Sequence, residues 1–189
     1  MKTIFKTAAI ALAFTISSTI FAQTKQVDAS KSTVAWIGKK ITGQHDGTVG
    51  LKSGALNFKN NKLAGGTFTV DMSVLTVKDI PTGKGKEDLE GHLKADDFFG
   101  TTKYPNANLV FKKIASKGDG LYTVTGDLTI KGITKPITFD MATTANTATT
   151  TLKVDRTAYG IKYKSGNFFK DLGDKTIDDI FELNVALVF

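Results

Sequence analysis

The side chains that could do acid–base or metal chemistry are few and scattered in this sequence. The chain has only two histidines, His45 and His92, and neither has a second histidine at the spacing of a metal-binding pair. A zinc site would need both to converge with a carboxylate such as Asp46, Asp96 or Asp97. There is no cysteine, so disulfides and thiolate ligands are excluded. We therefore predict no metal site.

Sequence motifs for enzymatic chemistry are also missing. There is no G-x-S-x-G elbow and no H-E-x-x-H helix, and Gly83-Lys84 lacks the glycine five residues ahead that a phosphate-binding loop needs. The run Asp171 to Asp179 carries four aspartates, but their spacing does not match a calcium-binding loop, and we expect a solvated loop there. We predict that the protein is not an enzyme and carries no cofactor.

Arg156 is the most distinctive single residue, because every other basic side chain except the two histidines is lysine. A guanidinium is a rigid planar fork that binds carboxylates bidentately or stacks on aromatic rings, which a lysine ammonium cannot do. We interpret Arg156 as a structural clamp onto Asp96, Asp97 or the final acidic loop. Direct contact with a ligand is the alternative.

Short alternating runs, broken by Gly, Asn and Asp about every ten residues, predict an all-β protein from Val27 onward. The clearest run places Phe68, Val70, Met72 and Val74 on one face of a strand. Residues 43–47, which include His45, are expected to form a turn. A short helical segment is expected near residues 86–99. The predicted strands are 33–37, 50–58, 66–75, 107–114, 121–130, 137–143, 149–156 and 180–189.

Eight antiparallel strands are the number at which a closed barrel can hold one small ligand. The chain also ends on an aromatic residue, Phe189, as many outer-membrane barrels do. Aromatic residues do not gather at the strand ends, however, and charged residues interrupt nearly every strand, which disfavours that alternative.

Residues 1–22 have the pattern of a signal peptide, with Lys2 and Lys6, a short apolar run and Ala22 at the cleavage position. Residues 23–189 then form one domain, exported to the periplasm or secreted and carrying no lipid anchor. No apolar run approaches the roughly 20 residues of a spanning helix, so we expect no stable membrane insertion. The net charge of +7 falls to +5 without Lys2 and Lys6, and we interpret it as a solvated lysine surface, not a nucleic-acid site.

Several ordered motifs resemble the YceI-like family. They are Gly91 to Phe99 (GHLKADDFF), Lys103-Tyr104-Pro105, Leu128 to Ile137 (LTIKGITKPI) and the later Arg156 to Ile161 (RTAYGI). The resemblance implies an exported, lipocalin-like eight-stranded antiparallel barrel that holds a polyisoprenoid or another long-chain lipid in an apolar tunnel. It also implies that a homodimer can form. A structural or stress-protective periplasmic protein without bound lipid is the alternative.

The ligand would contact apolar strand faces and the aromatic loops. Each methylene group taken from water would contribute about 0.8 kcal/mol, so no catalytic group is needed for binding. The candidate ligand-binding residues are Trp36, Phe68, Val70, Met72, Phe98, Leu109, Phe111, Phe139, Tyr159 and Phe168.

Overall fold

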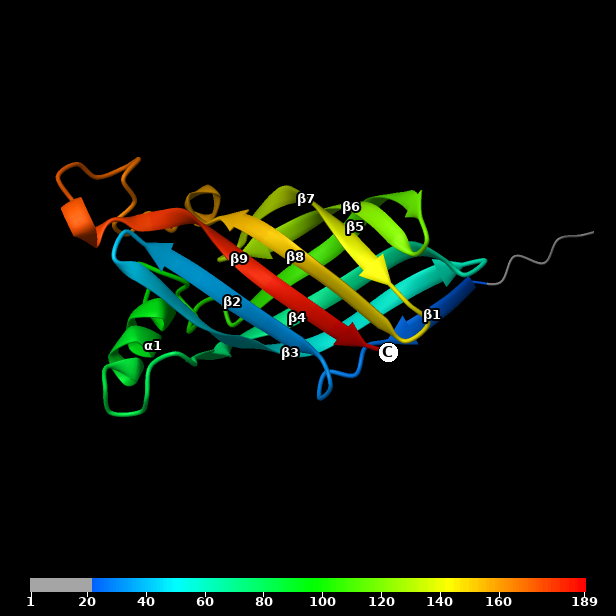
Figure 1. Ribbon diagram of the computed structural model, residues 1–189, viewed down its shortest axis with the longest axis horizontal. Coiled ribbons are helices and arrows are strands. Elements are labelled where there is room, and N and C mark those ends of the chain that lie inside the picture. The colour runs from blue at the N-terminus through cyan, green and yellow to red at the C-terminus, as the bar shows by residue number, and fades with distance from the viewer. Residues whose placement is uncertain (1–21) are drawn as a thin grey trace, which may run out of the picture.

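The computed structural model describes residues 22–189, and the rest of the predicted signal peptide, residues 1–21, lies outside the described part of the chain. The described part is an elongated barrel with a helix at one end (Figure 1). Its elements are β1 (Ala22–Gln26), β2 (Thr33–Lys40), β3 (Gly43–Lys59), β4 (Lys62–Val77), α1 (Lys86–Lys94), β5 (Asn106–Gly118), β6 (Leu121–Ile130), β7 (Ile133–Thr143), β8 (Thr147–Asp155), the 3₁₀ helices η1 (Arg156–Tyr159) and η2 (Gly173–Lys175), and β9 (Ile177–Val188).

Eight strands close the barrel, which confirms the predicted fold class. Each strand from β2 to β9 pairs antiparallel with the next, and β9 returns to pair with β2. The unpredicted β1 pairs with the last residues of β3, while β2 pairs with the first ones. Between them, the backbone N–H groups of Val27 and Asp28 donate to Gly54 and Val188. Both strands therefore occupy the same side of the long strand β3.

Alternation of side chains explains why these segments become strands of a barrel. In β6, Tyr122, Val124 and Leu128 are buried inside, and the threonines between them face outward. Outward threonines on adjacent strands make hydrogen-bonded cross-strand pairs, such as Thr125 with Thr138 at 3.0 Å. The strand thus has one dry and one wet face, as its sequence predicts.

The alternation predicted for β4 is wrong at Val74. The pairing of β3 with β4 shifts between Thr48 and Gly50, where extra residues of β4 bulge out of the ladder. The bulge reverses which side chains face inward, so Val74 is 53% exposed and Leu75 only 2%. A period of two cannot show where an extra residue will be inserted.

The predicted turn at residues 43–47 is also wrong. These residues begin β3 and pair with β2, and the tight turn lies at Ile41 and Thr42. His45 Nδ1 lies 2.8 Å from Asp79 Oδ2, and the Asp46 N–H donates to the same carboxylate. Glycine and polar residues usually indicate a turn, but here they form the first residues of a strand, which run from exposed Gly43 to buried Gly47.

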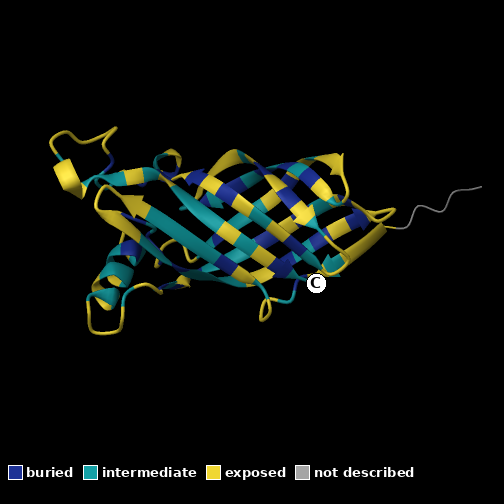
Figure 2. Ribbon diagram, viewed as in Figure 1, coloured by how far each residue is buried: buried dark blue, intermediate teal, exposed yellow. Residues whose placement is uncertain are grey.

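The two ends of the barrel are packed differently. At the end that carries β1, fully buried Leu56, Val124 and Ala148 form a solid core. Toward the end that carries α1, which we call the α1 end, inward residues of β2 and β9 are only partly buried, as the teal segments in Figure 2 show. The short helix predicted near residues 86–99 is present as α1, and it lies at the less densely packed end of the barrel.

Candidate functional site

An apolar cavity of about 160 Å³ lies inside the barrel. It is built from inward side chains of β2, β3, β4, β5, β6, β7, β8 and β9, and from α1 and the turn after it. Its apolar lining consists of Val34, Trp36, Val49, Leu51, Phe68, Val70, Met72, Leu75, Leu93, Phe98, Phe99, Ala107, Leu109, Leu128, Ile130, Phe139, Met141, Leu152, Ile177, Phe181, Leu183, Val185 and Leu187. The inward face of the closed sheet thus surrounds a space that side chains do not fill.

The polar groups that border the cavity are few. Asn108 and Thr150 are bonded within the protein, whereas, among residues 22–189, the buried indole N–H of Trp36 has no hydrogen-bond partner. The Asn108 side-chain oxygen accepts from Thr69 Oγ1 at 3.0 Å. The Thr150 hydroxyl donates outward to the Asp140 carbonyl at 2.6 Å. Neither histidine borders the cavity. Its wall can therefore desolvate a hydrocarbon chain, and no acid–base pair converges on it.

Seven of the ten predicted ligand-binding residues border the cavity. Trp36 comes from β2, and its indole ring lies so close over Gly47 that a Cβ there would be 2.7 Å from it. Phe98 lies in the turn after α1, and the others are on β4, β5 and β7. These seven residues are Trp36, Phe68, Val70, Met72, Phe98, Leu109 and Phe139.

The other three predicted residues, although all within residues 22–189, do not border the cavity. Phe111 is buried between Phe68 and Phe139, with ring centroids 5.5 and 5.9 Å away, so it belongs to the packed core. Tyr159 is buried in η1, where burial raises the pKa of its hydroxyl. Phe168 is 49% exposed on the loop before β9. Apolar character selected all three, but it cannot distinguish core, cavity and surface.

Among the cavity residues that sequence reasoning missed, strand β9 contributes the largest group from one element. Ile177, Phe181, Leu183, Val185 and Leu187 all border the cavity. Their spacing of two was visible in the sequence, so the period alone could have identified them. The period does not reveal that β9 closes the barrel against β2, where Leu183 pairs with the predicted residue Trp36.

Aromatic rings cover the cavity at the α1 end. Phe98 and Phe99 pack edge to face with their ring centroids 5.2 Å apart. The ring centroids of Phe99 and Phe181, on β9, are 6.1 Å apart. His92 on α1 packs against Tyr163 at 4.4 Å and against Phe98 at 5.8 Å. These contacts join α1, the turn after it and β9 over this end of the barrel.

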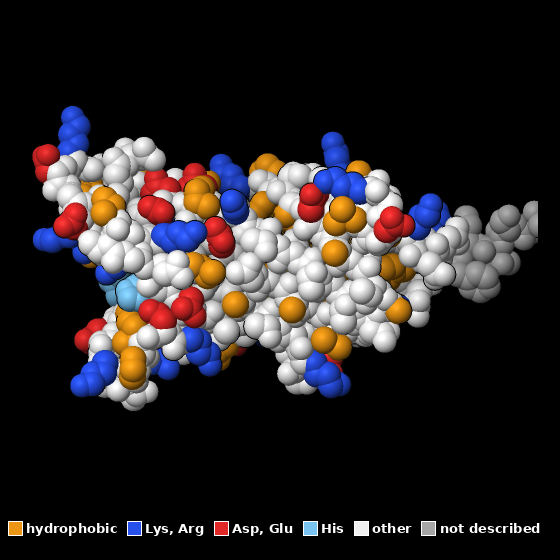
Figure 3. Space-filling view, in the orientation of Figure 1, with side chains coloured by type: hydrophobic (Ala, Val, Ile, Leu, Met, Phe, Trp, Pro, Cys, Tyr) orange, Lys and Arg blue, Asp and Glu red, His pale blue; other side chains and the backbone are white. Residues whose placement is uncertain are grey.

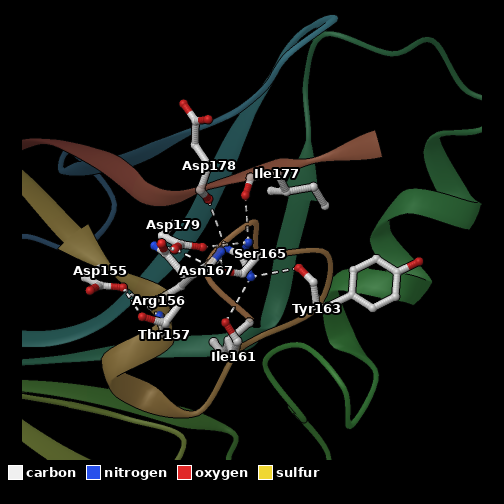
Figure 4. A network of polar contacts seen from close by, with 10 residues as sticks. All are labelled: Asp155, Arg156, Thr157, Ile161, Tyr163, Ser165, Asn167, Ile177, Asp178 and Asp179. Atoms are coloured by element: carbon white, nitrogen blue, oxygen red, sulfur yellow. Dashed lines mark hydrogen bonds and ion pairs between the residues drawn. The ribbon is translucent and has the colours of Figure 1, made fainter. Parts of the chain in front are cut away.

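Arg156 lies at the α1 end of the cavity and is 2% exposed (Figure 4). Nε donates to the Asp178 carbonyl, Nη1 to the carbonyls of Ile161 and Tyr163, and Nη2 to the Ile177 carbonyl, each at 2.9 Å. Nη2 also donates to Asp179 Oδ1 at 3.2 Å. These bonds use all five N–H donors of the guanidinium, so none is left for a ligand.

The surroundings of Arg156 act on its charge in opposite directions. Burial lowers the pKa of Arg156, while the nearby carboxylates, Asp179 foremost, favour the charged form. Asp179 Oδ2 also accepts from the Ser165 hydroxyl at 2.9 Å and from Asn167 Nδ2 at 2.7 Å. Asp179 is therefore part of this network, and the prediction that the whole run from Asp171 is a solvated loop is wrong there.

Among residues 22–189, no three His, Asp or Glu side chains are grouped so that they could hold a metal ion. No helix in that part of the chain is long and apolar enough to cross a membrane.

Comparison with known sequences identifies relatives of this chain. The sequence model of the YceI-like domain matches residues 26–189. A UPF0312 protein of Shewanella denitrificans is 35% identical over 85 residues, which cover 45% of this chain and 42% of the relative. Protein YceI of Shigella flexneri is 35% identical over 82 residues, 40% of this chain and 42% of the relative. The chain thus matches less than half the length of these curated relatives.

Solved structures share the barrel over most of its length. BcnA of Burkholderia cenocepacia is 25% identical with a TM-score of 0.66, and the match covers 86% of this chain and 99% of BcnA. A polyisoprenoid binding domain from Saccharophagus degradans, implicated in plant cell wall breakdown, is 16% identical with a TM-score of 0.61 over 86% of this chain and 95% of that domain. The second likeness shows the fold alone.

Proposed function

Because this chain belongs to the YceI-like family, we propose that it is an exported carrier or storage protein. It binds a polyisoprenoid or another long-chain lipid in the barrel cavity and carries out no catalysis. The observation that carries this proposal is the cavity itself, whose border is formed almost entirely by apolar side chains. The polyisoprenoid binding domain that shares the fold supports the choice of ligand class.

The size of the cavity sets a condition on the ligand. A cavity of about 150 Å³ accepts a molecule the size of benzene, so the 160 Å³ seen here holds only a short segment of a chain. A long lipid must therefore widen the cavity at its less densely packed end. Met72 and Met141 border the cavity, and unbranched methionine side chains can change their conformation at low energetic cost.

The outer surface of the barrel supports this proposal over an outer-membrane barrel. Lys52, Lys112 and Lys153 are exposed on three different strands, and Lys112 pairs with Asp127 at 3.3 Å. Charges on the outward face of a spanning strand would be placed in hydrocarbon at a cost of about 2–4 kcal/mol for each lysine near the midplane. This exterior is suited to water.

Location and assembly are further parts of the proposal. Cleavage after Ala22 would remove only the first residue of β1 and leave the rest of that strand paired with β3. The mature protein would then act in the periplasm or outside the cell. A homodimer is compatible with this function, and light scattering on the mature protein would establish its mass in solution.

Native mass spectrometry with organic extraction tests the function directly. The mature protein is purified from its own periplasm without added lipid, and we expect a stoichiometric adduct that extracts as a long-chain isoprenoid or fatty compound. A clean apo mass, unchanged after incubation with such lipids, would contradict the proposal and favour a structural or stress-protective protein without cargo.

A variant that fills the cavity locates the binding site. Val70 borders the cavity opposite Ala107 of the neighbouring strand, so Val70→Phe places a ring where the lipid would lie. We expect at least tenfold less adduct with little loss of thermal stability. Val110→Phe, at an outward position on β5, is the matched control and should keep the adduct. Equal adduct in both variants would place the lipid elsewhere.

A further inference from the structure

The loop between η1 and β9, residues 160–176, projects beyond the barrel at the α1 end (Figure 1). Phe168 and Phe169 are 49% and 48% exposed. Ile41, in the turn between β2 and β3, is 63% exposed, and its N–H donates to the Thr176 carbonyl at 3.4 Å. Among residues 22–189, Val74 at 53% and Ile180 at 45% are the other comparably exposed large apolar residues. Exposed apolar residues that cluster in this way indicate an interaction site.

A buried hydrogen-bond network holds the backbone turn that carries Phe168 and Phe169. The N–H groups of Phe168 and Phe169 both donate to the Ser165 carbonyl, at 3.1 and 2.9 Å. Ser165 is fully buried, and its hydroxyl donates to Asp179, which is bound to Arg156 (Figure 4). The turn that presents the rings is therefore anchored in the protein interior, although the rings themselves gain little from that burial.

Lysines accompany the exposed rings. The loop contains Lys162, Lys164, Lys170 and Lys175 against two aspartates, Asp171 and Asp174. Lys162 Nζ lies 4.4 Å from the centre of the Phe168 ring. Figure 3 shows charged side chains around this end of the molecule. Aromatic rings beside lysines suit the boundary between lipid headgroups and acyl chains, where rings enter the apolar layer and ammonium groups remain at the anionic surface.

The base of the loop forms the end of the cavity. Arg156, Ile177 and Asp178 border the cavity, and Ile177 N–H donates to the Lys164 carbonyl at 3.0 Å. We propose that the exposed rings of this loop, with Ile41, dock reversibly on an anionic phospholipid bilayer. Docking places the α1 end of the cavity against the membrane, so that a lipid can pass between them with little exposure to water. The biological purpose of docking rests on the proposed carrier function. Binding to a bilayer can be measured whether or not the protein carries a lipid.

Flotation with phospholipid vesicles tests the docking. The mature protein is mixed with vesicles of phosphatidylglycerol and phosphatidylcholine, and we expect it to float with them. Phe168→Ala with Phe169→Ala removes the two rings and should weaken vesicle binding at least tenfold. Val110→Ala with Leu121→Ala removes two apolar side chains, each 38% exposed, from the barrel wall and should bind as the wild type does.

The contribution of charge is measured in the same assay. Lys162→Gln with Lys170→Gln should weaken binding by about fivefold for each lysine on phosphatidylglycerol vesicles. Added salt should weaken wild-type binding in the same direction, and vesicles of phosphatidylcholine alone should bind less protein. Binding that is insensitive to lipid charge, to salt and to these substitutions would overturn the assignment of an anionic surface.

Cargo content, measured by native mass spectrometry on the same samples, separates the two proposals. A ring-deleted variant that keeps its lipid adduct but no longer floats supports docking through this loop. Wild-type protein that carries cargo but binds no vesicles overturns the docking proposal, leaves the carrier proposal standing and assigns the loop to a protein partner. Protein that floats through the rings but never carries cargo supports docking and contradicts the carrier function.

Discussion

At the scale of single residues, the environment decides what a side chain does more than its type does. Arg156 could have bound an anionic group, yet its five donors all end on protein acceptors, four of them backbone carbonyls. Those carbonyls belong to Ile161, Tyr163, Ile177 and Asp178, so one side chain joins the start of the exposed loop to the first residues of β9. Arg156 therefore acts as an internal clamp in this geometry.

We expect Arg156→Lys to destabilise the protein. A lysine has one nitrogen with three donors and cannot reach acceptors on both sides of the network, so buried carbonyls lose their partners. The loss should be about 2–3 kcal/mol, which lowers the melting temperature by roughly 5–10 °C in a domain of this size. Thermal unfolding followed by circular dichroism measures it.

Lys112→Arg is the matched control for this substitution. Lys112 is exposed on β5, so replacing its lysine side chain with arginine should leave the melting temperature unchanged. If Arg156→Lys also melts at the wild-type temperature, the network does not stabilise the fold.

At the scale of elements, a carboxylate of α1 joins the helix to the barrel in addition to the packing of Leu93 and His92. Glu90 Oε1 accepts from Thr76 Oγ1 at 2.7 Å and from the Val77 N–H at 2.9 Å, both on β4. These hydrogen bonds favour the charged form and lower the pKa of Glu90 from its usual value of 4.5. Leu93, also on α1, borders the cavity, so this attachment holds part of the cavity wall.

The attachment of α1 should therefore weaken in acid. Because the folded-state pKa of Glu90 is depressed, its stabilisation is complete above pH 4.5 and is lost as the pH falls through the folded-state pKa. Glu90→Gln should thus melt below the wild type at pH 7, and the difference should shrink toward zero at low pH. Melting curves recorded between pH 7 and pH 3 test this expectation.

Asp88→Asn provides the comparison on the same helix. Asp88 is exposed, so this variant should melt close to the wild type at both ends of that pH range. A constant difference between Glu90→Gln and wild type at every pH would show that the charge of Glu90 contributes nothing to the attachment.

At the scale of the whole molecule, the barrel combines a solid end with a hollow one. Leu56 and Val124 are fully buried at the β1 end, while Leu183 and Val185 border the cavity nearer α1. A core with unfilled space lacks contacts that a ligand would supply. Cargo should therefore stabilise the protein as well as occupy it.

Removal of cargo should lower the melting temperature. A ligand present at 100 times its dissociation constant stabilises the folded state by about 2.7 kcal/mol, which corresponds to roughly 5–10 °C here. Protein stripped by organic extraction and refolded should melt lower than protein with its lipid, and added lipid should restore the difference. Val70→Phe should show no response to lipid. An equal response in that variant would mean that the lipid binds outside the cavity.

Much of the fold could be predicted from the sequence because local rules govern it. A period of two predicts which segments are strands and which side chains face inward, and it does so for β6 from end to end. Six of the seven predicted residues that border the cavity lie on such inward strand faces, and the seventh, Phe98, lies in the turn after α1. The turn predicted at Gly43 to Gly47 and the inward side predicted for Val74 were wrong. Hairpin register and bulges depend on which strand lies alongside, and the period of one strand does not contain that information.

The sequence by itself determined the strands, their dry faces and the single arginine set apart from the lysines. Only the tertiary structure decided that β9 closes on β2, that the interior is filled at one end and open at the other, and that Phe168 faces solvent where Phe111 is buried. The physical reason is that alternation records the side of a sheet on which a residue lies. Whether that side is packed, hollow or uncovered depends on residues brought together from distant parts of the chain.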